Sequence, residues 1–213
     1  MSSFQLAYVP IGVPTFELVS AGEQFEKSKK MLRALCADTV CPDEMLLSVD
    51  KLTAFLDGLS PDLIVLQNIT FANSAYVSEV LKRFDCPILL WTLREPVIDG
   101  GRLRLNSLTG AFSAANTIKY FRKEQFGYVF GSPEEKSVIA ETGAYIRAAQ
   151  VRKELKSLKM ASVGHTPQGF GFGRALDAEL LKSFGVTLES IEARELIEKA
   201  QAYSEDDARE YLE

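Results

Sequence analysis

The chain has 213 residues, of which 46% are hydrophobic and 25% are charged, and its formal net charge at pH 7 is −5. Such values are typical of globular proteins, and this length predicts one large domain or one complete domain with part of another. Lysine and arginine do not gather into a basic patch, and no apolar run approaches the ~20 residues that span a bilayer, so neither nucleic acid nor a membrane is an expected partner.

The first 130 residues alternate between short apolar runs and amphipathic ones. Strands are predicted over residues 4–9, 39–41, 63–67, 87–91 and 126–130, and helices over 16–35, 46–59 and 106–121, with another that begins at Asn73 or Ser74. Strands that are apolar throughout and alternate with helices indicate a parallel sheet covered on both faces. The predicted fold class is therefore α/β, with residues 1–131 forming a doubly wound, mainly parallel, flavodoxin-like domain.

The second part of the chain begins with a helix start signal. Ser132 stands at the N-cap, Pro133 at the first helical position and Glu135 three residues after the cap. After this long helix the sequence predicts strands over 160–164 and 186–191, a helix over 174–184 closed by Gly185, and a terminal helix from Ser204. Two parallel strands are not stable alone. They either extend the first sheet or, as we expect for residues 132–213, begin a second, incomplete α/β domain.

Cysteine usage bears on the compartment of the protein. Cys36, Cys41 and Cys86 are odd in number and show no C-x-x-C spacing, which is typical of a reducing compartment. The N-terminal residues MSSFQLAYVPIGVP lack the basic stretch and long apolar core of a secretory signal. We expect a cytoplasmic protein whose cysteines are buried structural residues.

Candidate ligand-binding residues are expected in the loops that follow the strands, because open α/β sheets bind ligands at the carboxyl edge. The loop over residues 92–106 is the longest and most polar of these. Its donors and acceptor would suit a neutral polyol, and the preceding tryptophan offers a flat face for a sugar ring: Trp91, Arg94, Glu95, Arg102, Asn106 and Ser107. The alternative is structural: Arg94 and Glu95 pair with each other or with a neighbouring chain, Trp91 belongs to the core, and Asn106-Ser107 only caps a helix.

Two further features invite a site near residue 165. His165 is the single histidine, but without neighbouring cysteines or paired carboxylates it makes a poor metal ligand. The run GHTPQGFGFGRALD follows a strand and precedes a helix, as a dinucleotide loop does, yet Arg174 stands where that fingerprint needs glycine. Loop N–H groups there could still bind an anion, so nucleotide binding remains a third hypothesis.

Several pieces of the sequence together carry a resemblance. They are Glu95-Pro96, Gly100-Gly101-Arg102-Leu103, Asn106-Ser107-Leu108, Gly110, Pro167, Gly169 and Phe170. With them, nearly all of the chain resembles the N-terminal half of L-fucose isomerase-like proteins, which are related to L-arabinose isomerases. The resemblance rests on many moderate matches.

This resemblance implies an aldose–ketose isomerase with two N-terminal α/β domains, a C-terminal domain and a divalent metal, usually Mn²⁺. It implies that the metal ligands lie beyond this chain, so no cofactor is expected within it. It also implies a homo-oligomer in which the first domain lines the active site of a neighbouring subunit, through loops that here include Gly12 and Asn68. Better-known members have a basic residue and a tryptophan in those loops, and this chain has neither, so the identity of the sugar does not carry over.

Two hypotheses of different class follow. The first is the substrate-recognition part of a metal-dependent sugar isomerase, inactive alone because no base or electrophile for proton transfer is visible in the chain. The second is a stand-alone sugar-binding or regulatory module of the same fold without catalysis. Fold alone does not separate them.

Overall fold

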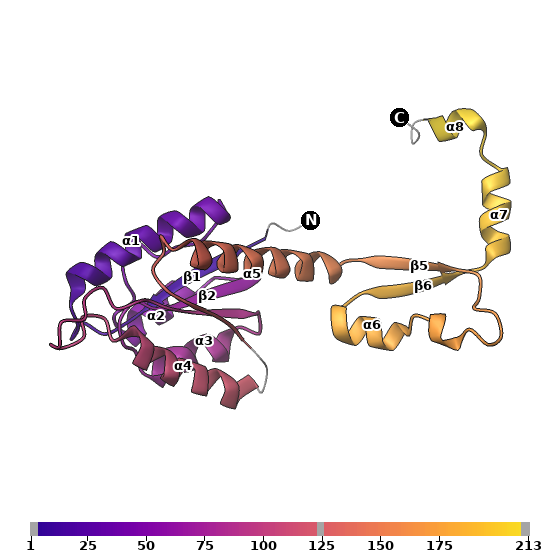
Figure 1. Cartoon of the computed structure of the whole chain (residues 1–213). Coiled ribbons are helices and arrows are strands. Elements are labelled where there is room, and N and C mark those ends of the chain that lie inside the picture. Colours follow the sequence, from indigo (N-terminus) through magenta and orange to yellow (C-terminus); the bar gives the residue numbers. More distant parts are fainter. Residues whose placement is uncertain (1–3, 123–125, 210–213) are drawn as a thin grey trace. The chain divides into compact units, whose positions relative to one another are not determined.

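The computed structural model describes residues 4–122 and 126–209 (Figure 1). The chain divides into two compact units, residues 1–150 and residues 151–213. No helix among the described residues is long and apolar enough to cross a membrane.

The first unit is built on four parallel strands, which lie in the order β1-β2-β3-β4. They are β1 (Leu6–Ile11), β2 (Leu63–Asn68), β3 (Ile88–Thr92) and β4 (Gly127–Phe130). Val40 and Leu46 add single parallel bridges to Ala7 and Ile11 of β1. The predicted strand over 39–41 is thus reduced to one bridge, yet its position beside β1 completes a flavodoxin-like order. The α/β fold class is confirmed.

Helices cover both faces of this sheet (Figure 1). Side chains of α1 (Leu18–Leu35) and α5 (Lys136–Leu155) pack in one buried cluster with alternate strand residues such as Val65. The other cluster holds the remaining strand residues, such as Leu66, with α2 (Val49–Leu56), α3 (Ser74–Arg83) and α4 (Ser107–Arg122). Both faces of β1, β2 and β3 are buried, which explains why these strands are mostly apolar, whereas β4 at the edge of the sheet buries only Val129 fully.

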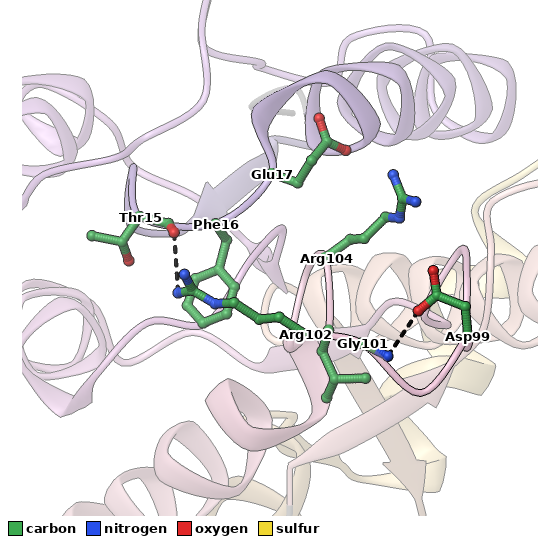
Figure 2. Close-up of a pocket in the computed structure, with 8 residues that line it drawn as sticks. Thr15, Phe16, Glu17, Asp99, Gly101, Arg102 and Arg104 are labelled. Atoms are coloured by element: carbon green, nitrogen blue, oxygen red, sulfur yellow. Dashed lines mark hydrogen bonds between the residues drawn. The ribbon is translucent and has the colours of Figure 1, made fainter.

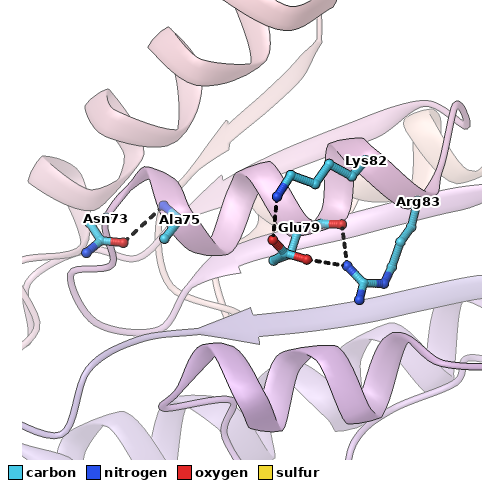
Figure 3. A network of polar contacts seen from close by, with 5 residues as sticks. All are labelled: Asn73, Ala75, Glu79, Lys82 and Arg83. Carbon is cyan, nitrogen blue, oxygen red and sulfur yellow. Dashed lines mark hydrogen bonds and ion pairs between the residues drawn. The ribbon is translucent and has the colours of Figure 1, made fainter.

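The helix starts follow local side-chain chemistry. Asn73 caps α3, as predicted, by accepting a hydrogen bond from the N–H of Ala75 at 3.1 Å, and within the same helix Glu79 pairs with Lys82 and Arg83 (Figure 3). Helix α1 begins two residues later than predicted, because the Glu17 carboxylate accepts from the first backbone N–H groups and takes the N-cap position.

The first unit extends to residue 150, past the predicted boundary near 131. The reason is that α5 belongs to this unit as far as residue 150, and its residues Val138, Ile146 and Ala149 are buried in the core. Helix α5 begins at Lys136, three residues later than the predicted first helical residue Pro133, because Ser132 to Glu135 form a turn in which the N–H of Glu135 donates to the carbonyl of Ser132 at 3.0 Å. The carboxylate of Glu135 does accept a hydrogen bond from the N–H of Ser132, at 2.7 Å.

The second unit contains a pair of parallel strands, β5 (Lys159–Val163) and β6 (Thr187–Ile191). The other elements are a 3-10 turn η1 (Gly171–Gly173) and the helices α6 (Asp177–Phe184), α7 (Ala193–Gln201) and α8 (Glu205–Arg209). Gly185 ends α6 in the left-handed conformation, at φ 75°, as predicted. Helix α7 was missed by the sequence analysis. All five side chains of β5 are exposed, so this unit has almost no core of its own.

Candidate functional site

Three loops are joined at the carboxyl edge of the first sheet. The loops follow β1, β2 and β3, and they contact one another through backbone hydrogen bonds. The N–H of Glu17 donates to the carbonyl of Arg104 at 3.0 Å, and the N–H of Phe71 donates to that of Leu105 at 2.8 Å. The ring of Phe16 adds a contact to Phe71, with centroids 6.1 Å apart. The edge of the sheet at which ligands were expected is therefore formed by three loops that contact one another.

The long loop between β3 and α4 is shaped by one carboxylate and one glycine. Glu95 accepts hydrogen bonds from the N–H groups of Leu105 and Asn106, at 2.8 and 3.0 Å, and so fixes the end of the loop against its beginning. Gly100 turns the loop in the left-handed conformation, at φ 83°, which glycine adopts without strain. The length and glycine content of this segment thus serve to fold it back over the sheet edge.

An open pocket of about 380 Å³ lies between this loop and the loop after β1 (Figure 2). It is lined by Thr15, Phe16, Glu17, Asp99, Gly101, Arg102, Leu103 and Arg104. The guanidinium of Arg102 lies 4.9 Å from the centre of the Phe16 ring, and its Nη2 donates to the carbonyl of Thr15 at 3.1 Å. These contacts hold Arg102 in one orientation at the pocket wall.

Four charges face this pocket, and their bonding differs. The carboxylate of Glu17 accepts from the N–H groups of Val19 and Ser20 at 2.7 and 2.8 Å, and that of Asp99 accepts from Gly101 at 3.0 Å. Hydrogen bonds from Ser20 hold the pKa of Glu17 below its usual range, and the charge of Arg104 acts in the same direction. The acids are therefore satisfied by backbone, while the arginines retain donors that no described residue accepts.

Among the predicted site residues, Arg102 is the one that lines the pocket. Asn106 is near it in the chain, with a positive φ of 50°, and its Oδ1 accepts from the hydroxyl of Thr109 at 2.7 Å. Glu95 supports the loop from beneath through its two backbone contacts. The pocket is thus lined in part by the loop that the sequence analysis singled out, while Glu95 and Asn106 make contacts within that loop.

Gly12, Asn68 and Ser107 lie buried at the strand ends. A side chain at Gly12 would approach Thr70 Oγ1 to 2.5 Å, so glycine there permits close approach of two loops. The hydroxyl of Ser107 donates to the carbonyl of Asn68 at 2.5 Å and accepts from the N–H of Leu93 at 2.9 Å. The side-chain amide of Asn68 is fully buried and has no hydrogen-bond partner among the described residues.

Trp91 and Arg94 do not lie as a sugar-binding role requires. Trp91 is fully buried, and its indole N–H donates to the carbonyl of Gly131 at 3.0 Å, so no ring face is open to a sugar. The core alternative accounts for it. Arg94 binds Glu135 through two bonds of 2.9 Å and lies 4.8 Å from the Phe130 ring centre. The structural alternative of ion pairing holds for Arg94, but its partner is Glu135 and not Glu95.

The sequence analysis missed Arg104, Glu17, Asp99 and Phe16 as pocket residues. The alternation Arg102-Leu103-Arg104 was an available signal, since both arginines belong to the same polar loop. The contributions of Phe16 and Glu17 were not visible, because they depend on the contact between two loops about 85 residues apart.

A metal site was not expected in this chain. No group of three or more His, Cys, Asp or Glu residues that could hold a metal ion occurs in residues 4–122 and 126–209. The residues present therefore do not fit the divalent metal that the resemblance implies, and no step of the chemistry can be assigned to a metal here. Cys36, Cys41 and Cys86 are partly buried.

Comparison with known proteins gives the chain a set of named relatives. It is 62% identical over 207 residues to a sulfoquinovose isomerase of Clostridium sp. (strain MSTE9), which covers 97% of this chain and 46% of the relative. It is 36% identical over 198 residues to one of Priestia megaterium (strain ATCC 12872 / QMB1551), covering 92% and 44% respectively. A third, of Alkalicoccus urumqiensis, is 31% identical over 201 residues, covering 93% and 45%.

These relatives are sugar isomerases. The chain spans about half the length of the curated relatives that it matches. No protein-family model matches the chain. The names support the sugar-isomerase part of the predicted resemblance, and the sugar that they name is neither L-fucose nor L-arabinose.

Proposed function

We propose that this chain is the substrate-recognition part of an aldose–ketose isomerase that acts on a sulfonated hexose such as sulfoquinovose. The observation that carries the proposal is the 62% identity to a sulfoquinovose isomerase along 97% of the chain. Because this identity extends over nearly every helix and strand, we infer that the surface has the same function in both proteins. The pocket beside Arg102 and Arg104 supports it, because guanidinium groups suit an anionic sugar better than the neutral polyol first expected.

The chemistry assigns this chain a limited share of the reaction. An aldose–ketose isomerisation moves a proton between two adjacent carbons and needs a base within about 3 Å of the carbon acid. The described pocket acids, Glu17 and Asp99, are held by backbone N–H groups at the loop and helix starts. They are suited to shape the pocket, and the proton-transfer groups and any Mn²⁺ site belong, in this proposal, to other polypeptide.

If the proton-transfer groups belong to other polypeptide, that polypeptide must bring them next to this pocket. The open form of the pocket, at the rim of the sheet, is compatible with a site that a neighbouring subunit of a homo-oligomer completes. The small-molecule sugar is then the shared partner of both surfaces. The hypothesis of a stand-alone binding module makes a different prediction. It predicts that a longer protein containing this sequence does not isomerise the sugar.

The test compares this chain with the longest polypeptide in which its sequence occurs naturally. Each is incubated with sulfoquinovose in D₂O, with added Mn²⁺ or with EDTA, and followed by ¹H NMR. We expect the longer protein to form the 2-keto isomer with loss of the C2 proton signal, and EDTA to abolish this. We expect no turnover by the chain alone. Failure of the longer protein with sulfoquinovose, or turnover by the chain alone, would contradict the proposal.

A further inference from the structure

Resting on the proposed function, we propose that the pocket between the β1–α1 and β3–α4 loops is the subsite for the sulfonate group of the sugar, with Arg104 as its principal donor and Arg102 as a second, pre-oriented one. Nothing in the relatives' names assigns the sulfonate to any residue. The inference concerns which end of the substrate this chain holds.

The first step is the bonding state of the two arginines. Arg102 uses one N–H on the carbonyl of Thr15, and its guanidinium is fixed against the Phe16 ring. Arg104 has no side-chain hydrogen bond or ion pair within 4 Å to any of the described residues. Its backbone is nevertheless fixed, because its carbonyl accepts from the N–H of Glu17 at 3.0 Å. One arginine is thus oriented in advance, and the other is anchored at its main chain (Figure 2). The charge of Arg104 acts on Glu17 from a distance, but no described residue accepts a hydrogen bond from its guanidinium.

The second step is the state of the acids that share the pocket. The two arginines and two carboxylates of the pocket have no formal net charge together, and ion pairs among the four would leave few guanidinium donors for an anion. Here both carboxylates are occupied by backbone donors, from Val19 and Ser20 for Glu17 and from Gly101 for Asp99. Neither acid makes an ion pair of 4 Å or less with Arg102 or Arg104 among the described residues. The guanidinium N–H groups are therefore the donors left for a ligand.

The third step is the chemical match. A sulfonate remains ionised at neutral pH and presents three acceptor oxygens, like a phosphate, and planar guanidinium groups bind such anions with paired hydrogen bonds. The same pocket offers little to a neutral CH₂OH group, whose single hydroxyl would leave most of these donors without a partner. A site built to bind an ionised group rejects the analogue that lacks it, because its polar groups are then left unpaired.

The alternative ligand is an inorganic or buffer anion that binds two arginines without any relation to the sugar. The two cases differ in what the substitution changes. A sulfonate subsite predicts that loss of an arginine raises KM for sulfoquinovose and spares kcat, because the binding lost is the same in the ground state and the transition state.

The variants are Arg104→Gln, Arg102→Gln and the control Arg33→Gln. Arg33 is exposed in the last turn of α1, whereas the pocket adjoins the first turn of this helix, about 20 Å away along its axis. In the longer protein we expect Arg104→Gln to raise KM for sulfoquinovose about tenfold or more, Arg102→Gln to raise it less, and Arg33→Gln to leave it unchanged. KM values within twofold of the parent for both pocket variants would overturn the assignment.

A binding measurement on the 213-residue chain separates this inference from the proposed function. Methanesulfonate is titrated while the melting temperature is recorded, with sodium chloride at equal ionic strength as the comparison. We expect methanesulfonate to stabilise the parent chain and Arg33→Gln more than chloride does, and to lose this advantage in Arg104→Gln. Equal effects of the two salts, or undiminished stabilisation of Arg104→Gln, would contradict the subsite.

Failure of the proposed function and failure of the sulfonate subsite give different combinations of results. If the longer protein does not isomerise sulfoquinovose but methanesulfonate stabilises the parent and not Arg104→Gln, the anion subsite stands and the substrate assignment fails. If sulfoquinovose is isomerised with unchanged KM in the arginine variants, the function stands and the subsite fails.

Discussion

At the residue scale, Arg94 and Glu135 form an ion pair through two hydrogen bonds of 2.9 Å. The two hydrogen bonds from Arg94, followed by one from the N–H of Ser132, lower the pKa of Glu135 from 4.5 to about 2. A carboxylate whose pKa is depressed in the folded state contributes stability above its unfolded pKa. This contribution is lost as the pH falls from about 4.5 towards about 2.

We therefore expect Glu135→Gln to lower the melting temperature at pH 7 by no more than about 2–4 °C, since both side chains are partly exposed to solvent. We also expect the variant to lose less stability than the parent between pH 4.5 and 2. Thermal unfolding across this pH range measures both effects. Glu141→Gln, at an exposed position of α5, is the control, and parallel pH profiles for parent and Glu135→Gln would refute the assignment.

At the element scale, the close packing of α4 against the end of the sheet depends on Gly110. A side chain at Gly110 would approach Asn68 Nδ2 to 2.6 Å and the backbone nitrogen of Ala72 to 3.0 Å. Backbone cannot give way cheaply, so the helix would have to move away from the sheet edge. Since the loop that carries Arg102 and Arg104 leads directly into α4, this close approach also sets the position of the pocket wall.

The matched comparison is between two helical glycines. Gly110→Ala should destabilise the first unit by about 1–3 kcal/mol, because it overpacks a closed contact. Gly22→Ala, in α1 with no atom within 4 Å of the added carbon, should stabilise it by about 0.5–1 kcal/mol. Hydrogen exchange of the β2 amides measures both changes. Destabilisation by both substitutions would show that the tight contact at Gly110 is not the cause.

The helices and strands show which parts of the fold the sequence could predict. Apolar strands and helix ends could be predicted, because each depends on residues close together in the sequence, as at Asn73 and Gly185. The strand expected over 39–41 failed because its pairing with β1 is confined to single bridges. Helix α7 was missed, although its pairs Arg194–Glu198 and Glu195–Lys199 have helical spacing.

The site was less predictable for a physical reason. The sequence singled out the loop that lines the pocket, yet it gave no means to tell Arg94, which binds a carboxylate 41 positions away, from Arg104, which does not. Likewise, Trp91 reads the same whether its ring is open to a ligand or enclosed by the core. Such distinctions arise from contacts between distant segments, and no local pattern encodes them.

At the scale of the whole molecule, the two units differ in how much they bury. Strands β1, β2 and β3 are buried at every position, whereas β5 is exposed at every position and β6 at most of them. Two parallel strands with open faces are marginal by themselves. The proposed membership in a longer isomerase accounts for this surface, because further polypeptide would cover it.

We expect the amides of β5 and β6 in this chain to exchange with solvent at least about 100-fold faster than those of β1 to β3, in line with their lack of buried contacts. Hydrogen exchange followed by mass spectrometry resolves the two units. In the longer protein the protection of β5 and β6 should rise towards that of the first unit. Equal protection of both sheets in the chain alone would show that the second unit is complete as it stands.

The enclosed position of Trp91 has a practical consequence. It is the single tryptophan of the sequence, and it lies in the core of the first unit with its indole bonded to Gly131. Its fluorescence emission therefore reports on that unit alone, shifting to longer wavelength when water reaches the ring, while the second unit stays silent. One optical signal can thus follow the melting of one half of the polypeptide, and circular dichroism recorded alongside it supplies the other half by difference.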